Sequence, residues 1–127
     1  MSSQLTITFE DEYIQVRSDG EKNYQFALRL WMEVAETCRQ HECYKVLGIA
    51  RTTIPLKTLD GYNHYKIFQQ AGITRRHRIA WVELNPDAYE AVDFVEMVLR
   101  NRAVAQIRLF SDVVEAKQWL LGEQAES

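Results

Sequence analysis

The chain has 127 residues, about the length of one domain, and its composition is 46% hydrophobic, 26% charged and 11% aromatic. These values exclude a disordered, collagen-like or membrane-spanning chain. The net charge of −3 offers no general attraction to nucleic acid or to an anionic membrane, so we expect neither nucleic-acid binding nor membrane insertion.

The N-terminus has no charged region followed by an apolar region, so the sequence predicts no signal peptide. Cys38 and Cys43 are too few for a disulfide scaffold. We therefore expect a cytoplasmic protein with reduced thiols.

The first two predicted elements form a hairpin. Leu5, Ile7 and Phe9 alternate with polar residues, as in a half-buried strand. A turn follows, and residues 13–16 begin a second strand, so residues 4–18 predict an antiparallel hairpin.

A helix is predicted from Asn23, a suitable N-cap, to about His41. Its core stripe repeats every three or four residues, and comprises Phe26, Ala27, Leu30, Val34 and Cys38. Residues 44–50 then form a continuous apolar run, which is typical of a strand covered on both faces.

Residues 52–59 predict a loop, and Thr58 is a candidate N-cap for a second helix that ends at Ala71, with Gly72 after it. Residues 78–84 predict a buried strand. Asn85 and Pro86 then begin a third helix that runs to about residue 102.

Residues 106–110 predict the last strand. Asp112 and Glu115 form a capping-box-like pair for a final helix, which ends at Gly122. The order ββαβαβαβα predicts an α/β fold: a mixed, mostly parallel sheet with an N-terminal antiparallel hairpin and four helices. We expect one domain over residues 1–127, with a frayed tail after about residue 121.

The C-terminal region resembles a known family. Residues 107–120 (IRLFSDVVEAKQWL) resemble the last strand and helix of the SpoIIAA-like proteins, a branch of the STAS-like superfamily. Residues 78–82 (RIAWV) and 44–47 (YKVL) resemble two further strands of that family. The resemblance implies a STAS-like fold and, more weakly, a regulatory module that acts through protein contacts. SpoIIAA-like domains also resemble the lipid-binding CRAL-TRIO fold, which implies a carrier of a small apolar or anionic, lipid-like ligand as the alternative.

Sporulation regulators of the STAS type carry a phosphorylated serine in an Asp-Ser-Ser-Gly motif. The corresponding residues here are 58–61 (TLDG), which lack both serines, and Thr58 is the nearest hydroxyl. Thr58 is thus a possible phosphosite equivalent, although we expect it to act only as an N-cap.

The sequence contains no recognisable catalytic constellation. Known nucleophile and nucleotide motifs are absent, so we predict no enzyme activity, no catalytic residue and no cofactor. Cys38, His41 and Cys43 lie close together without a fourth ligand, and we predict no metal site there.

Two surfaces are candidates for binding. The carboxyl ends of parallel strands commonly hold ligands, and the residues predicted at this edge are Arg51, Thr52, Asn85 and Ser111. The first and third helices each carry apolar residues outside their core stripes, which favours a homodimer or another protein partner. The predicted self-association residues are Leu28, Trp31, Met32, Phe94 and Met97.

Overall fold

The computed structural model describes residues 3–122 and contains a five-stranded sheet in the order β1-β2-β3-β4-β5. β1 and β2 are antiparallel, and the other neighbouring strands are parallel, which confirms the predicted fold class. The predicted frayed tail falls outside the described residues from residue 123 onward.

The elements are β1 (Gln4–Phe9), β2 (Ile14–Gly20), α1 (Tyr24–His41), β3 (Lys45–Thr52), α2 (Thr58–Tyr62), α3 (His64–Ala71), β4 (Arg78–Glu83), the 3₁₀ helix η1 (Pro86–Ala88), α4 (Tyr89–Asn101), β5 (Gln106–Phe110) and α5 (Val113–Leu121).

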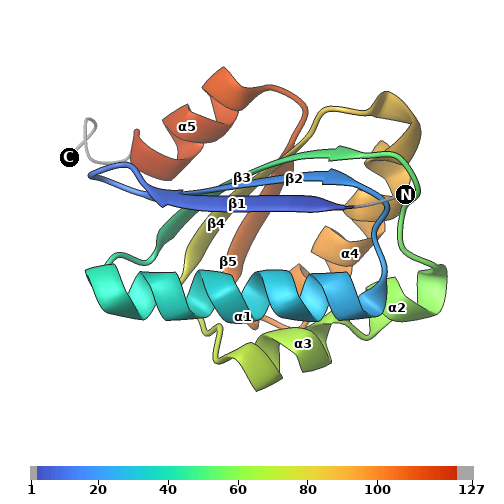
Figure 1. Ribbon diagram of the computed structural model, residues 1–127, viewed down its shortest axis with the longest axis horizontal. Helices are drawn as coiled ribbons and strands as arrows, with labels where there is room; N and C mark the ends of the chain where they lie inside the picture. The colour runs from blue at the N-terminus through green and yellow to red at the C-terminus, as the bar shows by residue number, and fades with distance from the viewer. Residues whose placement is uncertain (1–2, 123–127) are drawn as a thin grey trace.

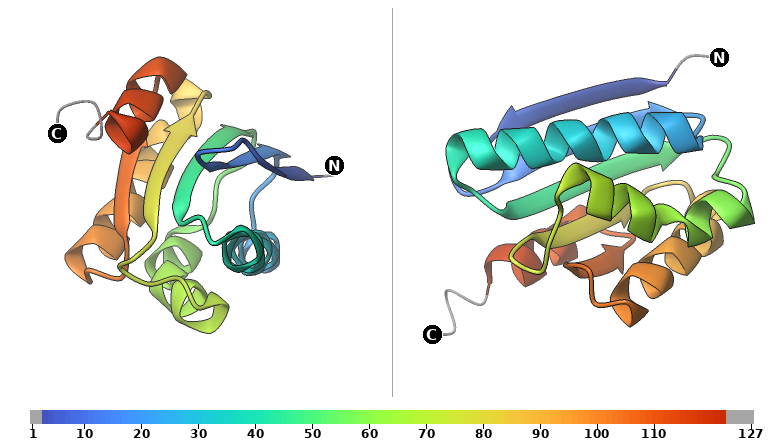
Figure 2. Two further views of the ribbon diagram at one scale, coloured as in Figure 1. Left: turned by 90° about the vertical axis from the view of Figure 1, so that its left-hand side faces the viewer. Right: turned by 90° about the horizontal axis from the view of Figure 1, so that it is seen from below.

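The helices cover the two faces of the sheet unequally. The strands follow one another in order across the sheet, and right-handed crossovers then place all their helices on one face. α1, α3 and α4 lie on that face, whereas α5 is the one helix within residues 3–122 that lies on the other, against β3, β4 and β5 (Figures 1 and 2). The sheet therefore separates a large core under α1, α3 and α4 from a smaller core under α5.

The predicted second helix is two helices in the structure. α2 ends at Tyr62, and α3 begins at His64 after Asn63, whose ψ of 6° departs from regular helix geometry. Thr58 is not the N-cap: Lys57 occupies that position without a side-chain hydrogen bond, and Thr58 is the first residue of α2. Gly72 follows α3 in the left-handed conformation, at φ 85°, as predicted.

The other predicted caps are present. Asn23 Oδ1 accepts a hydrogen bond from the Phe26 amide at 2.8 Å, and Asp112 accepts from the Val114 and Glu115 amides. Asn85 caps η1 rather than α4, because the first turn after Pro86 is a 3₁₀ turn.

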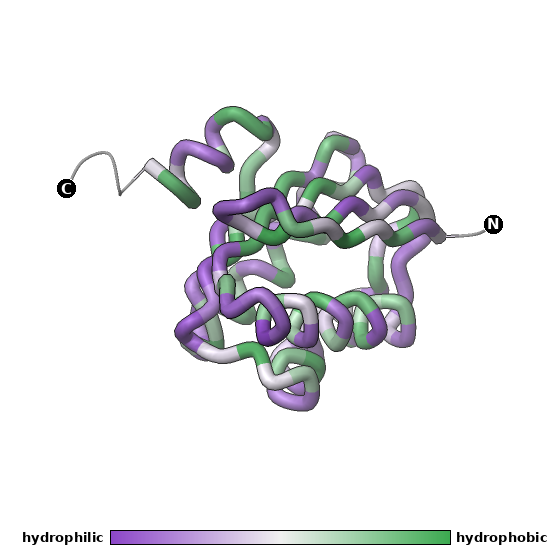
Figure 3. The backbone as a smooth tube through the Cα atoms, turned by 60° about the vertical axis from the view of Figure 1, so that its left-hand side comes forward, coloured by the Kyte–Doolittle hydropathy of each residue, from purple (hydrophilic) through white to green (hydrophobic). Residues whose placement is uncertain are grey.

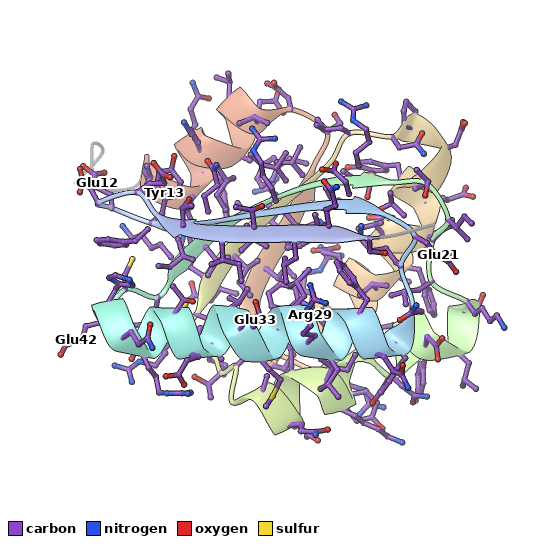
Figure 4. The ribbon with its side chains drawn as sticks, viewed as in Figure 1. Glu12, Tyr13, Glu21, Arg29, Glu33 and Glu42 are labelled. Carbon is purple, nitrogen blue, oxygen red and sulfur yellow. The ribbon has the colours of Figure 1, made fainter. Side chains whose placement is uncertain are left out.

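α1 is amphipathic and shows how the large core forms. Its inner face is buried, while Arg29 and Glu33 form an exposed ion pair at 3.5 Å on the side that faces the viewer in Figure 4. Hydrophobic and hydrophilic residues alternate along the helices in Figure 3, as expected where each helix buries one face. Trp31 lies inside, 4.7 Å from the Phe68 ring and 5.3 Å from the Trp81 ring between ring centroids.

Candidate ligand cavity

The large core contains a cavity of about 80 Å³ between α1, α4 and the sheet, near the carboxyl ends of β3 and β4. Its lining is almost entirely apolar. The apolar lining residues are Phe26, Ala27, Leu30, Trp31, Leu56, Trp81, Val92, Val95, Leu99, Ile107 and Leu109. Four lining residues are polar or ionisable: Lys22, Thr52, His64 and Glu96. An apolar pocket with a few convergent polar groups is the usual form of a small-molecule site.

Lys22 lines the cavity where the chain passes from β2 into α1. Its Nζ lies 3.5 Å from the Gly20 carbonyl oxygen and 5.3 Å from the centre of the Phe26 ring. Burial lowers the pKa of Lys22, and the nearby carboxylates of Glu83 and Asp19 oppose this shift. The ammonium group is thus a partly desolvated cation beside an apolar space.

Glu83 anchors the end of the sheet beside the cavity. It shares a face of β4 with Ile79 and Trp81, and it is 1% exposed. Its carboxylate accepts hydrogen bonds from the Thr52 amide at 3.0 Å, the Thr52 hydroxyl at 2.7 Å and the Asn85 amide at 3.1 Å. The Asn85 side chain donates in turn to the Thr52 carbonyl at 2.6 Å. Three donors therefore compensate the burial of this charge and join the ends of β3 and β4.

His64 reaches the cavity from the first turn of α3. The ring is 5% exposed, and its Nδ1 lies 3.4 Å from the Asp60 carbonyl oxygen. Burial lowers the pKa of His64 to about 4, although the hydrogen bond with the Asp60 backbone favours the charged form. The imidazole is therefore neutral at pH 7.

Glu96 faces the cavity from α4 and is 4% exposed. Arg100, one turn later, donates a hydrogen bond of 2.5 Å to its carboxylate. Burial raises the pKa of Glu96, and Arg100 counteracts that shift.

A second groove, of about 280 Å³, adjoins the cavity. Both share Leu56 and Val95, so these two side chains separate the groove from the cavity. The groove runs between α2 and α4 and includes Thr58 and Phe94. The loop that carries Leu56 is fixed to the start of α1, because the Lys22 amide donates to the Ile54 carbonyl at 2.8 Å.

The structure divides the predicted ligand edge. Thr52 and Asn85 meet at Glu83, as described above. Arg51 is exposed and shares a strand face with Leu47 and Ile49 of the smaller core, so it lies on the opposite side of the sheet from Thr52. Ser111 is exposed beyond β5. Of the four predicted residues, Thr52 and Asn85 therefore meet at Glu83, and Thr52 also lines the cavity.

The predicted self-association residues also separate. Met32 and Met97 are exposed, at 44% and 41%, and Leu28 and Phe94 are half-buried. Trp31 is a correction: it is 5% exposed, lies in the large core and lines the cavity, so it is not part of an exposed face. A tryptophan on the flank of a helical wheel is large enough to reach the core from there.

The two cysteines and the histidine considered as metal ligands contact different parts of the protein. Cys38 is buried in the core, where burial raises the pKa of its thiol to about 12. His41 stacks on Phe9 at 4.3 Å between ring centroids, while Cys43 Sγ lies 3.6 Å from the Glu12 carbonyl. Within residues 3–122, no three His, Cys, Asp or Glu side chains are grouped as metal ligands.

Sequence reasoning missed Lys22, Glu83 and Glu96, and it assigned no role to His64. A usable signal existed for Glu83: it follows Ile79 and Trp81 at a spacing of two, so a carboxylate falls on the core face of a buried strand. Lys22 and Glu96 carry no comparable signal, because lysine before a helix and glutamate within one are ordinary surface residues.

Comparison with known proteins identifies the fold. A solved structure of an uncharacterised protein of the DUF3478 family with a SpoIIAA-like fold, from Shewanella loihica PV-4, superposes with a TM-score of 0.54 and 13% identity over 93% of each chain. The chain therefore has a SpoIIAA-like fold, as the resemblance implied. No family model matches the chain, and no curated protein matches it. Among the described helices, none combines the length and the apolarity that a bilayer crossing requires.

Proposed function

We propose that this protein binds a small, mainly apolar molecule in the cavity between α1, α4 and the sheet, as a non-catalytic cytoplasmic carrier or sensor. The cavity is the observation that carries the proposal, because its lining is apolar and it adjoins a groove with access to solvent. Its volume of about 80 Å³ is smaller than the ~150 Å³ engineered cavity that binds benzene. A longer ligand would extend past Leu56 into the groove.

The chemistry of the lining supports binding rather than catalysis. Among the described lining residues there is no serine or cysteine. The Thr52 hydroxyl donates to the Glu83 carboxylate, which also accepts hydrogen bonds from two backbone amides. Both side chains therefore have a structural role. Among the lining residues that the structure describes, no nucleophile is paired with an oriented base.

A regulatory module that contacts proteins, as a homodimer or with another partner, is the second candidate. The exposed methionines of α1 and α4 favour it, because methionine is enriched at interfaces. The two candidates are compatible. Phe94, a predicted self-association residue, and Thr58 both line the groove. A molecule that extended from the cavity into the groove would therefore change the surface that a protein partner contacts.

The first test is native mass spectrometry of the purified protein, followed by denaturing mass spectrometry and extraction. A discrete additional mass that is lost on denaturation supports a carrier. Trp31 and Trp81 line the cavity, so their fluorescence provides a second measurement during titration with short-chain alcohols.

A matched pair of variants tests the location. Ala27 lines the cavity, whereas Ala35 is buried in the same helix and does not line it. Ala27→Leu should fill the space and abolish binding, whereas Ala35→Leu should reduce stability by overpacking and leave the affinity unchanged. Equal binding by wild type and Ala27→Leu would refute the cavity as the site.

A further inference from the structure

The two ring nitrogens of His64 determine which molecules the cavity can bind. This inference rests on the proposed function. The ring is buried and neutral at pH 7, and Nδ1 lies 3.4 Å from the Asp60 carbonyl oxygen. A carbonyl oxygen can only accept a hydrogen bond, so Nδ1 carries the proton and donates it. Nε2 is then left with a lone pair and is an acceptor.

No described residue donates a hydrogen bond to Nε2. The ring lines the cavity while its Nδ1 faces the backbone of the preceding turn, so Nε2 is the polar atom that it offers to the cavity. A ligand hydroxyl would donate to this acceptor in place of water, inside a lining that is otherwise almost entirely apolar.

The other polar lining groups do not satisfy Nε2 through the protein itself. The Thr52 hydroxyl donates to Glu83, and the Glu96 carboxylate accepts from Arg100. Lys22 is a donor, but its Nζ lies at the Gly20 carbonyl and over the Phe26 ring.

We propose that the cavity selects small apolar molecules that carry one hydroxyl group, with the hydroxyl donating to His64 Nε2. Aliphatic alcohols and their close analogues form the ligand class. An ether of the same shape lacks the donor, and it would leave Nε2 unsatisfied. A carboxylate of the same chain would have to use Lys22 instead, whose charge already interacts with the carboxylates of Glu83 and Asp19.

The experiment compares 1-hexanol, 1-methoxypentane and hexanoate by ligand-observed NMR and calorimetry at pH 7. The alcohol should bind about fivefold to tenfold more tightly than the ether, as expected for one hydrogen bond to a buried group. The His64→Phe variant removes the acceptor and should bind alcohol and ether equally. His41→Phe, at an exposed histidine outside the cavity, is the matched control and should keep the preference.

A measurement on the wild-type protein covers the case in which His64→Phe does not fold. Hexanol should shift the ¹⁵N resonance of His64 Nε2, and the ether should leave it unchanged.

The outcomes distinguish a failure of the proposed function from a failure of the selection by His64. If no probe binds, the proposed function fails. If alcohol and ether bind equally, or if hexanoate binds most tightly, the cavity is a binding site but the selection by His64 is wrong.

Discussion

Glu83 joins two strand ends, and its removal should be costly. Substituting Glu83 by Ala leaves the Thr52 and Asn85 amides without an acceptor inside the protein, and we expect a loss of about 2–4 kcal/mol in the free energy of unfolding. Urea denaturation measures this loss. Glu83→Gln keeps acceptor oxygens and should lose less. The exposed Glu90→Ala is the control and should stay within about 0.5 kcal/mol of wild type. A Glu83→Ala variant as stable as Glu90→Ala would contradict the assigned role of Glu83.

His64 should make the fold sensitive to mild acid. Its pKa falls from 6.5 in the unfolded chain to about 4 in the fold, so the unfolded state binds the proton first as the pH drops. The contribution of His64 to the free energy of unfolding is therefore fully present above about pH 6.5. It is lost progressively towards pH 4, by on the order of 3 kcal/mol. His77, whose pKa burial also lowers, adds to this loss. Glu96 acts in the opposite direction, because burial raises its pKa and favours protonation in the fold.

Urea midpoints between pH 7.5 and 4.5 test this dependence. The wild-type midpoint should fall across that range, and His64→Phe should flatten the fall. His41→Phe, at an exposed histidine outside the cavity, is the matched control. An unaltered slope in His64→Phe would assign the acid sensitivity to other groups.

At the scale of elements, β3 and β4 depend on a close approach at Gly48. A Cβ atom at this position would lie 2.0 Å from the Trp81 ring, so Gly48→Ala must displace an indole that also lines the cavity. We expect a loss of about 1–3 kcal/mol and a change in tryptophan emission. Gly72→Ala is the contrast: nothing lies within 4 Å of its Cβ, so only the left-handed backbone is strained and the emission should not change. Unchanged emission in Gly48→Ala would show that the ring has room to move.

Local signals predicted most elements, because their causes are local. The hairpin, the doubly covered strands and the caps at Asn23 and Asp112 depend on periodicity and on single hydrogen bonds. The break at Asn63 was not predictable in this way, because the surrounding residues continue a helical pattern. The cavity depends on residues from α1, α3, α4 and three strands, so only their packing brings Lys22, His64 and Glu96 together.

At the scale of the whole molecule, the exposed methionines test self-association. If the protein is a homodimer through α1 and α4, Met32→Asp together with Met97→Asp should give monomers, because a buried unpaired carboxylate is strongly unfavourable. Analytical ultracentrifugation of wild type and the double variant measures the mass. Val114→Asp, at an exposed residue of α5, is the control. A dimer that persists in the double variant would place the interface elsewhere.

The position of α5, on the opposite face of the sheet from α1, α3 and α4, has a consequence for synthesis. Neighbouring strands follow one another along the chain, so each strand can pair with its predecessor as it leaves the ribosome. The last helix emerges after the sheet, and until then Leu47, Ile49 and Val82 have no helix to cover them. The nascent chain therefore exposes an aggregation-prone apolar face at this stage, and a truncation before Asp112 would make that exposure permanent.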